Sequence, residues 1–94
     1  MGMKFEYPLV LVAWEDITSD GAVQGTKEEV LRSIKPCIRY TPGFYIATTP
    51  DYVIVATDYD MRDGVPCLGA PSQYPKSVVK AIYTLRMGKQ LEEM

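Results

Sequence analysis

The stretch from Cys37 to Thr57 reads CIRYTPGFYIATTPDYVIVAT. Two runs rich in β-branched and aromatic residues flank Thr49-Pro50-Asp51, where proline suits the corner of a turn, so the stretch predicts two strands joined by that turn. Alternate residues of a strand face opposite sides, and both faces of the second run are apolar, which indicates a strand covered on two sides. Pro42-Gly43 interrupts the first run and predicts a bend or bulge in one long strand. A bent strand paired with a covered one predicts a small barrel.

The segments before this stretch predict one strand and one short helix. Pro8–Trp14 is continuously apolar, as expected of a strand. After a loop rich in Asp, Ser and Gly, Thr26 and Glu29 have the spacing of a capping box, and Pro36 ends the helix. A helix over Thr26–Ile34 has only about two turns, so we expect it to persist only if it docks on the sheet.

The segments after this stretch are less regular. Asp58–Gly64 predicts a polar loop, and Val65–Pro71 predicts a short strand at best, at an edge because of its prolines. Val78–Arg86 has both helical and alternating apolar positions, but its β-rich composition favours a single 3₁₀ turn at Pro75–Ser77 followed by a strand. Residues 87–94 are charged and predict a tail that is frayed or helical.

Composition bounds the class of protein. The 94 residues predict a single domain over 1–94, and the net charge of −2 gives no overall attraction to nucleic acid. The chain has no histidine, which excludes a Cys–His nucleophile, a Ser-His-Asp triad and a histidine-ligated zinc. The longest apolar run is too short to cross a membrane, and no secretory signal is apparent, so we expect a cytoplasmic protein whose two cysteines are reduced.

Several motifs together resemble a group of small phage- and prophage-encoded proteins of unassigned function. The matching positions are Trp14-Glu15-Asp16, the helix from Thr26 to Pro36, Gly43, Asp51–Ala56, and Pro75-Lys76 with Val79, Ile82 and Leu85. Pro42 and Tyr74 depart from the pattern, which prefers Val and Ile there. The Pro-Lys turn before the last strand is similar to the closing element of Sm-like and SH3-like barrels. By analogy, the resemblance implies a mainly β fold: a five-stranded, strongly bent barrel with one short helix after the first strand, residing in the host cytoplasm.

Two acidic constellations suggest chemistry that their spacing does not favour. Asp58-x-Asp60-x-x-Asp63-Gly64 places the glycine at position 7, whereas an EF-hand calcium loop needs it at position 6. Glu15, Asp16 and Asp20 could pair as catalytic carboxylates of a small hydrolase, but adjacent strand residues point in opposite directions. We therefore predict neither a metal site nor a catalytic residue, and no cofactor.

The remaining candidates point to binding. Trp14 either plugs one end of the barrel or stacks on a ligand, and exposed aromatic and arginine side chains could extend such a surface. The sequence predicts a non-enzymatic accessory module that binds a host protein or self-associates through Val78–Arg86; a nucleotide or RNA binder, such as an Sm-like ring or a nucleotide sponge, is the alternative. The candidate binding residues are Trp14, Asp16, Arg39, Tyr40, Tyr45, Lys76, Lys80 and Tyr83.

Overall fold

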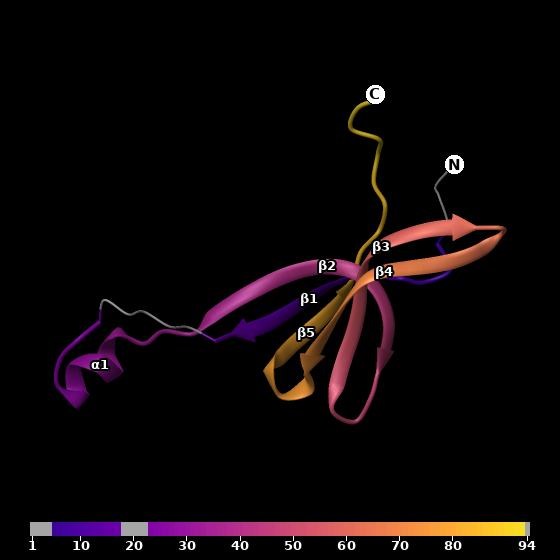
Figure 1. Cartoon of the computed structure of the whole chain (residues 1–94). Helices are drawn as coiled ribbons and strands as arrows, with labels where there is room; N and C mark the ends of the chain where they lie inside the picture. The colour runs from indigo at the N-terminus through magenta and orange to yellow at the C-terminus, as the bar shows by residue number, and fades with distance from the viewer. Residues whose placement is uncertain (1–4, 18–22, 94) are drawn as a thin grey trace.

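Five antiparallel strands form one sheet, and a single short helix follows the first strand (Figure 1). The computed structural model describes residues 5–17 and 23–93. Neighbouring strands in the sheet follow the order β4-β3-β2-β1-β5. The mainly β class, with one helix after the first strand, is therefore confirmed. The elements are β1 (Leu9–Asp16), α1 (Lys27–Ser33), β2 (Cys37–Thr48), β3 (Tyr52–Arg62), β4 (Val65–Pro75), the 3₁₀ turn η1 (Lys76–Val78) and β5 (Val79–Thr84).

Strand β2 changes its partner along its length. Residues 37–44 pair with β1, and residues 44–48 pair with β3, so Phe44 belongs to both ladders. The β1–β2 ladder runs through Pro42 without a shift, and the bulge lies between Tyr45 and Ala47 instead of at Pro42-Gly43. Gly43 has a different role: a Cβ there would lie 3.1 Å from the Ala56 carbonyl oxygen, so glycine lets β3 approach closely.

The sheet is open, so the expected barrel closure is not seen in the described part of the chain. Strands β4 and β5 are the two edges, and β5 pairs only with β1. Pro66, Pro71 and Pro75 remove three possible donors from β4, which makes it a poor partner for another strand. The 3₁₀ turn before the last strand is present but lies one residue later than the predicted Pro75–Ser77. The strand assignment of the ambiguous C-terminal segment is confirmed for Val79–Thr84.

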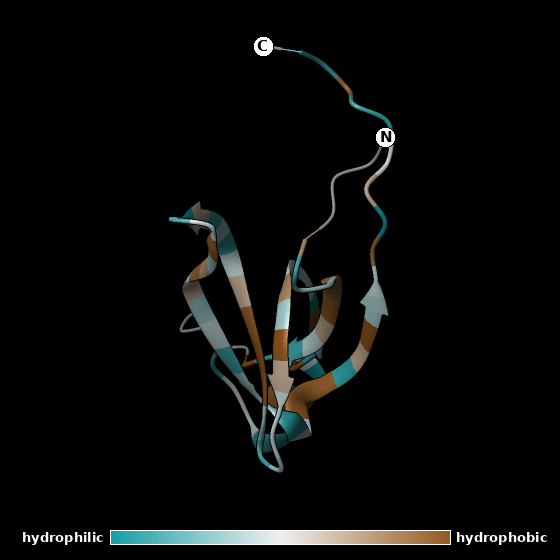
Figure 2. Cartoon of the chain, turned by 90° about the vertical axis from the view of Figure 1, so that its right-hand side faces the viewer, coloured by the Kyte–Doolittle hydropathy of each residue, from teal (hydrophilic) through white to brown (hydrophobic). Residues whose placement is uncertain are grey.

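The core is a small cluster of valines on one face of the sheet. Val10, Val12, Val53 and Val55 are at most 3% exposed. Trp14, Tyr45, Tyr74 and Val79 are partly buried and pack against these valines. Figure 2 shows apolar residues alternating with polar ones along the strands, while the C-terminal tail is largely polar. The apolar second run of the central hairpin therefore supplies half of the core, as a strand of that composition should.

The β3–β4 hairpin is longer than the sequence interpretation allowed. Asp58–Gly64 is not a loop: β3 continues to Arg62, which pairs with Val65. Only Asp63 and Gly64 form the turn, with φ of 51° and 76°. Positive φ at both central residues is the type I′ geometry that Asp-Gly favours in two-residue hairpins. The interpretation of residues 65–71 as a short strand was also wrong, because β4 has 11 residues.

Helix α1 has the predicted cap but not the predicted docking. The Glu29 amide donates to Thr26 Oγ1 at 3.2 Å, and the helix ends before Pro36. None of its residues is buried, and both Leu31 and Ile34 are 61% exposed. Figure 1 shows the helix beyond the end of the β1–β2 pair, away from the sheet. Residues 23–36, which carry the helix, are called the helical arm below.

Substitutions in the helical arm should not change the stability of the sheet. Thr26→Ala removes the N-cap acceptor and should cost the helix about 1 kcal/mol, which faster amide exchange in α1 would report. The midpoint of global unfolding should stay constant for this variant, because no helix residue is buried. Leu31→Ala should likewise change the monomer by less than about 0.5 kcal/mol, instead of the cost of a buried leucine. A midpoint that falls in both variants would place the helix on the sheet.

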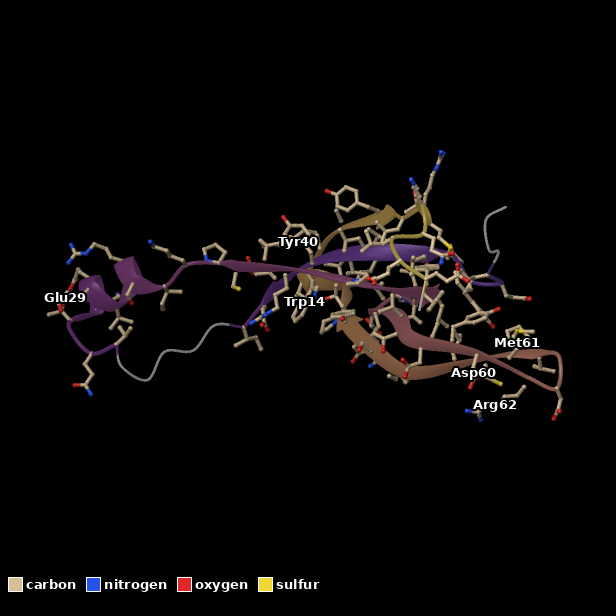
Figure 3. The ribbon with its side chains drawn as sticks, turned by 90° about the horizontal axis from the view of Figure 1, so that it is seen from above. Trp14, Glu29, Tyr40, Asp60, Met61 and Arg62 are labelled. Carbon is tan, nitrogen blue, oxygen red and sulfur yellow. The ribbon has the colours of Figure 1, made fainter. Side chains whose placement is uncertain are left out.

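The monomer is far from compact. Its radius of gyration is 18.0 Å, whereas a compact chain of this length has about 12 Å. Its accessible surface is 7750 Å², roughly 2,000 Å² more than a folded monomer of this mass exposes. The helical arm and the β3–β4 hairpin project at opposite ends (Figure 3), and residues 85–93 are exposed and form neither helix nor strand. Much surface is thus left without an intramolecular partner.

Candidate interaction surface

The face of the sheet opposite the valine core carries a row of exposed apolar side chains. Register places Tyr83, Leu11 and Pro42 side by side across three strands, and Ala81, Ala13 and Tyr40 form the next row. Ile38 lies opposite Glu15, and the Leu85 amide donates to the Leu9 carbonyl at 2.9 Å, which extends the surface at both ends. We call this surface the outer face; its exposed apolar residues are Ile38, Tyr40, Pro42, Tyr83 and Leu85.

The exposure of this surface is unusual for residues of its kind. Tyr40 is 63% exposed and Tyr83 is 55% exposed. Ala13, on the strand between theirs, is small and only 4% exposed. Ile38 and Leu85 are each more than one-third exposed. A contiguous exposed apolar surface on a folded protein is typical of a contact surface for another molecule. Tyrosine suits that purpose, because its ring packs while its hydroxyl stays hydrated.

Trp14 lies on the core side, so it does not belong to the outer face. Its indole Nε1 donates to Thr41 Oγ1 at 3.0 Å, and its ring centroid lies 5.0 Å from that of Tyr74. The ring packs against the valine core. Figure 3 shows Trp14 and Tyr40 on opposite sides of the sheet. Trp14 therefore packs on the core of an open sheet instead of plugging the end of a barrel, and its indole donor is occupied.

Asp16 and Arg39 bind each other. The Arg39 Nε–H donates to an Asp16 carboxylate oxygen, and the other oxygen accepts from the Ile17 amide at 2.8 Å. Asp16 therefore ties the loop that follows β1, as expected of Asp at a strand end. The hydrogen bond to Asp16, and then its charge, raise the pKa of Arg39, so this side chain stays protonated. Because the Arg39 side chain is 58% exposed, the pair contributes little to stability.

The other predicted binding residues separate into two groups. Tyr45 packs against the core, and its hydroxyl lies 2.6 Å from Thr48 Oγ1. Tyr40 and Tyr83 are on the outer face, and Lys76 and Lys80 are exposed on η1 and β5. Within the described residues, neither lysine forms an ion pair. The eight residues therefore do not form one site: the structure brings Tyr40 and Tyr83 to one face and places Trp14, Asp16, Arg39 and Tyr45 on the other.

The free edge of β5 has backbone groups directed away from the sheet. Since the Leu85 amide donates to β1, the alternation of an antiparallel strand directs the N–H and C=O groups of Ile82 and Thr84 outward. No proline interrupts β5, whereas β4 has three across its length. An unguarded edge of this kind is a template for another strand. The edge adjoins the outer face at Tyr83.

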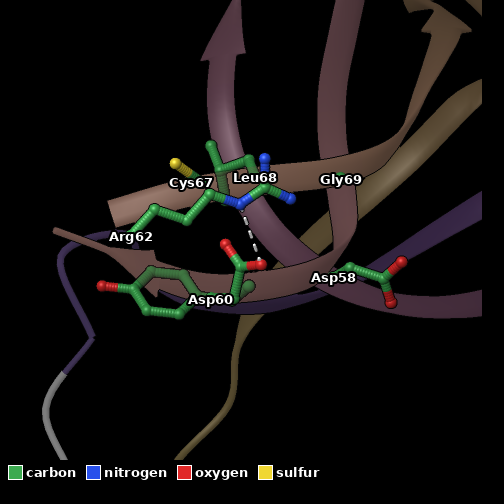
Figure 4. A pocket seen from close by; sticks show the side chains of 7 residues that line it. Asp58, Asp60, Arg62, Cys67, Leu68 and Gly69 are labelled. Carbon is green, nitrogen blue, oxygen red and sulfur yellow. Dashed lines mark hydrogen bonds and ion pairs between the residues drawn. The ribbon is translucent and has the colours of Figure 1, made fainter. Parts of the chain in front are cut away.

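A hollow of about 190 Å³ lies on the β3–β4 hairpin (Figure 4). Its lining includes Asp58, Asp60, Arg62 and Cys67, and Arg62 Nε lies 3.3 Å from an Asp60 carboxylate oxygen. The Asp60 side chain is 56% exposed, so its charge is solvated. Among the described residues, no group of three or more His, Cys, Asp or Glu side chains could hold a metal ion. The hollow is a solvated acidic surface in this arrangement.

The acidic residues after β1 do not converge on one site. Glu15 pairs with Ile38 and Asp16 pairs with Cys37, so successive side chains lie on opposite faces. Asp20, the third carboxylate considered, lies outside the described residues. The two carboxylates are therefore not arranged to share one substrate.

The sequence interpretation did not include four exposed apolar residues among the candidates for binding: Ile38, Pro42, and Leu31 and Ile34 of the helical arm. Ile38 and Pro42 lie in the predicted strand and could have been placed beside Tyr40 by their period of two.

In the part of the chain that the structure describes, no helix has the length and apolar character to cross a membrane. A scan against protein-family models and searches of the curated proteins and of the solved structures found no match, so the functional argument rests on the geometry of this chain.

Proposed function

We propose that this chain is a non-enzymatic binding module that acts through protein–protein contact, beginning with its own association. The observation that supports this most is the free edge of β5, where outward groups of Ile82 and Thr84 adjoin the exposed Tyr83. Two copies can pair their β5 strands antiparallel about a two-fold axis, which closes the assembly at a dimer. Each copy then satisfies the outward backbone groups of the other.

This pairing also gathers basic residues that a single copy disperses. Lys80 lies on β5, Lys76 lies on η1, and Arg86 follows two residues after the strand. Antiparallel pairing places Lys76 and Lys80 of each copy toward Arg86 of the other copy, at the two ends of the paired strands, although each chain has a net charge of −2. The resemblance to phage-encoded proteins supports a partner in the host cytoplasm. The basic surface of the dimer would suit an acidic protein as that partner.

Equilibrium sedimentation of the parent chain and of two variants at Thr84 tests the proposal. Thr84→Pro deletes an outward N–H without removing a bond to β1, so it should weaken association by about tenfold, which corresponds to about 1.4 kcal/mol. Thr84→Val keeps the N–H and should associate like the parent. A parent that stays monomeric at high micromolar concentration would disprove self-association.

Copurified ligand should be measured in the same preparation. The nucleotide-binding alternative predicts an excess of absorbance at the wavelength of nucleobases that survives washing at high salt. Trp14 and Tyr45 pack against the core, which removes two of the aromatic rings that could stack on bases. A stoichiometric nucleotide bound by a monomer would favour the alternative over the proposal.

A further inference from the structure

The helical arm carries an apolar surface without an intramolecular partner. Its helix has 7 residues and buries none of them. An isolated helix this short is marginal in water, because most helical stability in proteins comes from packing. Leu31 and Ile34 are each 61% exposed, and Ile17, which directly follows β1, is 90% exposed. The cap at Thr26 fixes where the helix begins, but it does not replace a surface to pack on.

The outer face is a matching acceptor on the same chain. It is an apolar surface built from three strands, with Tyr40 beside the small residue Ala13 in one row and Tyr83 beside Leu11 in the next. An amphipathic helix typically docks its apolar side chains on such a surface through anchors spaced by three or four residues. Leu31 in the helix and Ile34, its C-cap residue, have that spacing along the chain. The chain therefore contains both halves of one contact and leaves both exposed.

The topology brings these halves together in a β5-paired dimer. The helical arm leaves the sheet where β1 ends and β2 begins, and because β5 is antiparallel to β1, this is also the end at which β5 starts. In an antiparallel β5–β5 pair, the start of one β5 lies beside the end of the other. The arm of one copy thus leaves its sheet at the same end of the paired sheet as Tyr83 and Leu85 of the partner's outer face, with its own β5 between them.

Charge and area agree with this arrangement. The first turn of α1 carries Glu28 and Glu29, whereas Lys80 and Arg86 gather from both copies along the paired strands. These clustered cations repel one another, and the acidic first turns of the two arms would offset that repulsion. A standard interface buries about 800 Å² on each partner. Each monomer exposes roughly 2,000 Å² more than a compact chain of its mass, and the helical arm is one of the projecting parts that contribute to this surplus.

We infer that the helical arm of each copy docks on the outer face of a second copy, so that the dimer is held by an exchange of arms as well as by its β5 edges. The inference rests on the proposed self-association. Docking converts a marginal helix into a packed one, and it covers the apolar surface around Tyr40 and Tyr83. The arm is then the element that gives the edge contact its specificity for this chain.

The test uses one variant on each side of the contact. Leu31→Glu keeps a good helix former and places a charge on the arm side of the interface. Tyr40→Glu places a charge on the outer face, which is the other side of the interface. Each should weaken dimerisation by at least about tenfold in equilibrium sedimentation, the loss typical of a buried anchor. Arg32→Glu, on the same exposed helix, is the matched control and should dimerise at least as well as the parent, because it adds negative charge without changing an apolar anchor. Neither changed position is buried in the monomer, so each variant should fold.

Mixing the two weakened variants gives a result that a structural defect would not give. The Tyr40→Glu copy retains a normal arm, and the Leu31→Glu copy retains a normal outer face, so one of the two arm contacts is restored. The mixture should form more dimer than either variant alone at the same total concentration. A mixture that dimerises no better than its components would overturn the inference.

The outcomes separate the inference from the proposed function. A parent that does not associate would end both. Association that is weakened by Thr84→Pro but unchanged by Leu31→Glu would leave the β5 edge contact standing and disprove arm exchange. Association weakened by Leu31→Glu but not by Tyr40→Glu would show that the arm docks elsewhere, which also overturns the inference.

Discussion

Val55→Asp is expected to unfold the protein at neutral pH. Val55 is fully buried and packs with Val10, Val12 and Val53, so a carboxylate there would have neither water nor a cation. Burying an unpaired charge costs several kcal/mol even after the structure relaxes. The whole domain has a free energy of unfolding of about 5–14 kcal/mol, if it follows the usual range per residue. Far-UV circular dichroism and a denaturant titration would measure the loss.

Thr57→Asp is the matched control for this variant. Thr57 lies two residues further along β3 and is exposed, so the same new charge should change the free energy of unfolding by less than about 0.5 kcal/mol. Equal effects of the two substitutions would mean that Val55 does not lie in the core. A Val55→Asp protein with the parent's midpoint would contradict the register of β3 itself.

Trp14→Ala should destabilise the fold by about 3 kcal/mol, the lower end of the range for large aromatic truncations, because the side chain is only partly buried. The loss combines packing against the valine core, the contact with Tyr74 and the hydrogen bond to Thr41. Trp14→Phe should recover most of the packing and leave the hydrogen bond missing, with an intermediate midpoint. Circular dichroism is the measurement, since the only tryptophan is the residue removed.

Tyr40→Ala separates the two faces of the sheet. Tyr40 is 63% exposed, so its truncation should leave the midpoint of the monomer within about 0.5 kcal/mol of the parent. Truncation of Trp14, in the core, should thus lower the stability of the fold. Truncation of Tyr40, on the outer face, should instead weaken association. Comparable destabilisation by both truncations would argue against an exposed outer face.

Much of the fold could be predicted from local pattern. The Thr49-Pro50-Asp51 turn, the apolar strand that follows it and the 3₁₀ turn before β5 are short-range features, and each is found. The Asp63-Gly64 turn is also local, and its dipeptide is a strong hairpin signal. The acidic residues around this turn have the composition of a loop, yet the run from Asp58 to Arg62 pairs in the β3–β4 ladder.

The remaining features depend on contacts that no local pattern contains. The apolar stripe of α1 predicted docking, yet whether a helix reaches the sheet depends on the chain around it, and Leu31 is exposed. The bulge lies near Tyr45 because β2 exchanges one partner for another there, which is a property of three strands together. The same holds for the candidate surface: only the register shows that Tyr40 and Tyr83 share a face and Trp14 does not.

The projecting arms of the monomer also affect how its size would be measured. A radius of gyration of 18.0 Å is that of a compact protein of about 250 residues. On a size-exclusion column calibrated with globular standards, a single chain would therefore elute at the position of a compact dimer or trimer. An exchange of arms that folds the projections inward would increase the mass while changing the elution volume little. Mass from light scattering or sedimentation, instead of elution volume, is what distinguishes one copy from two.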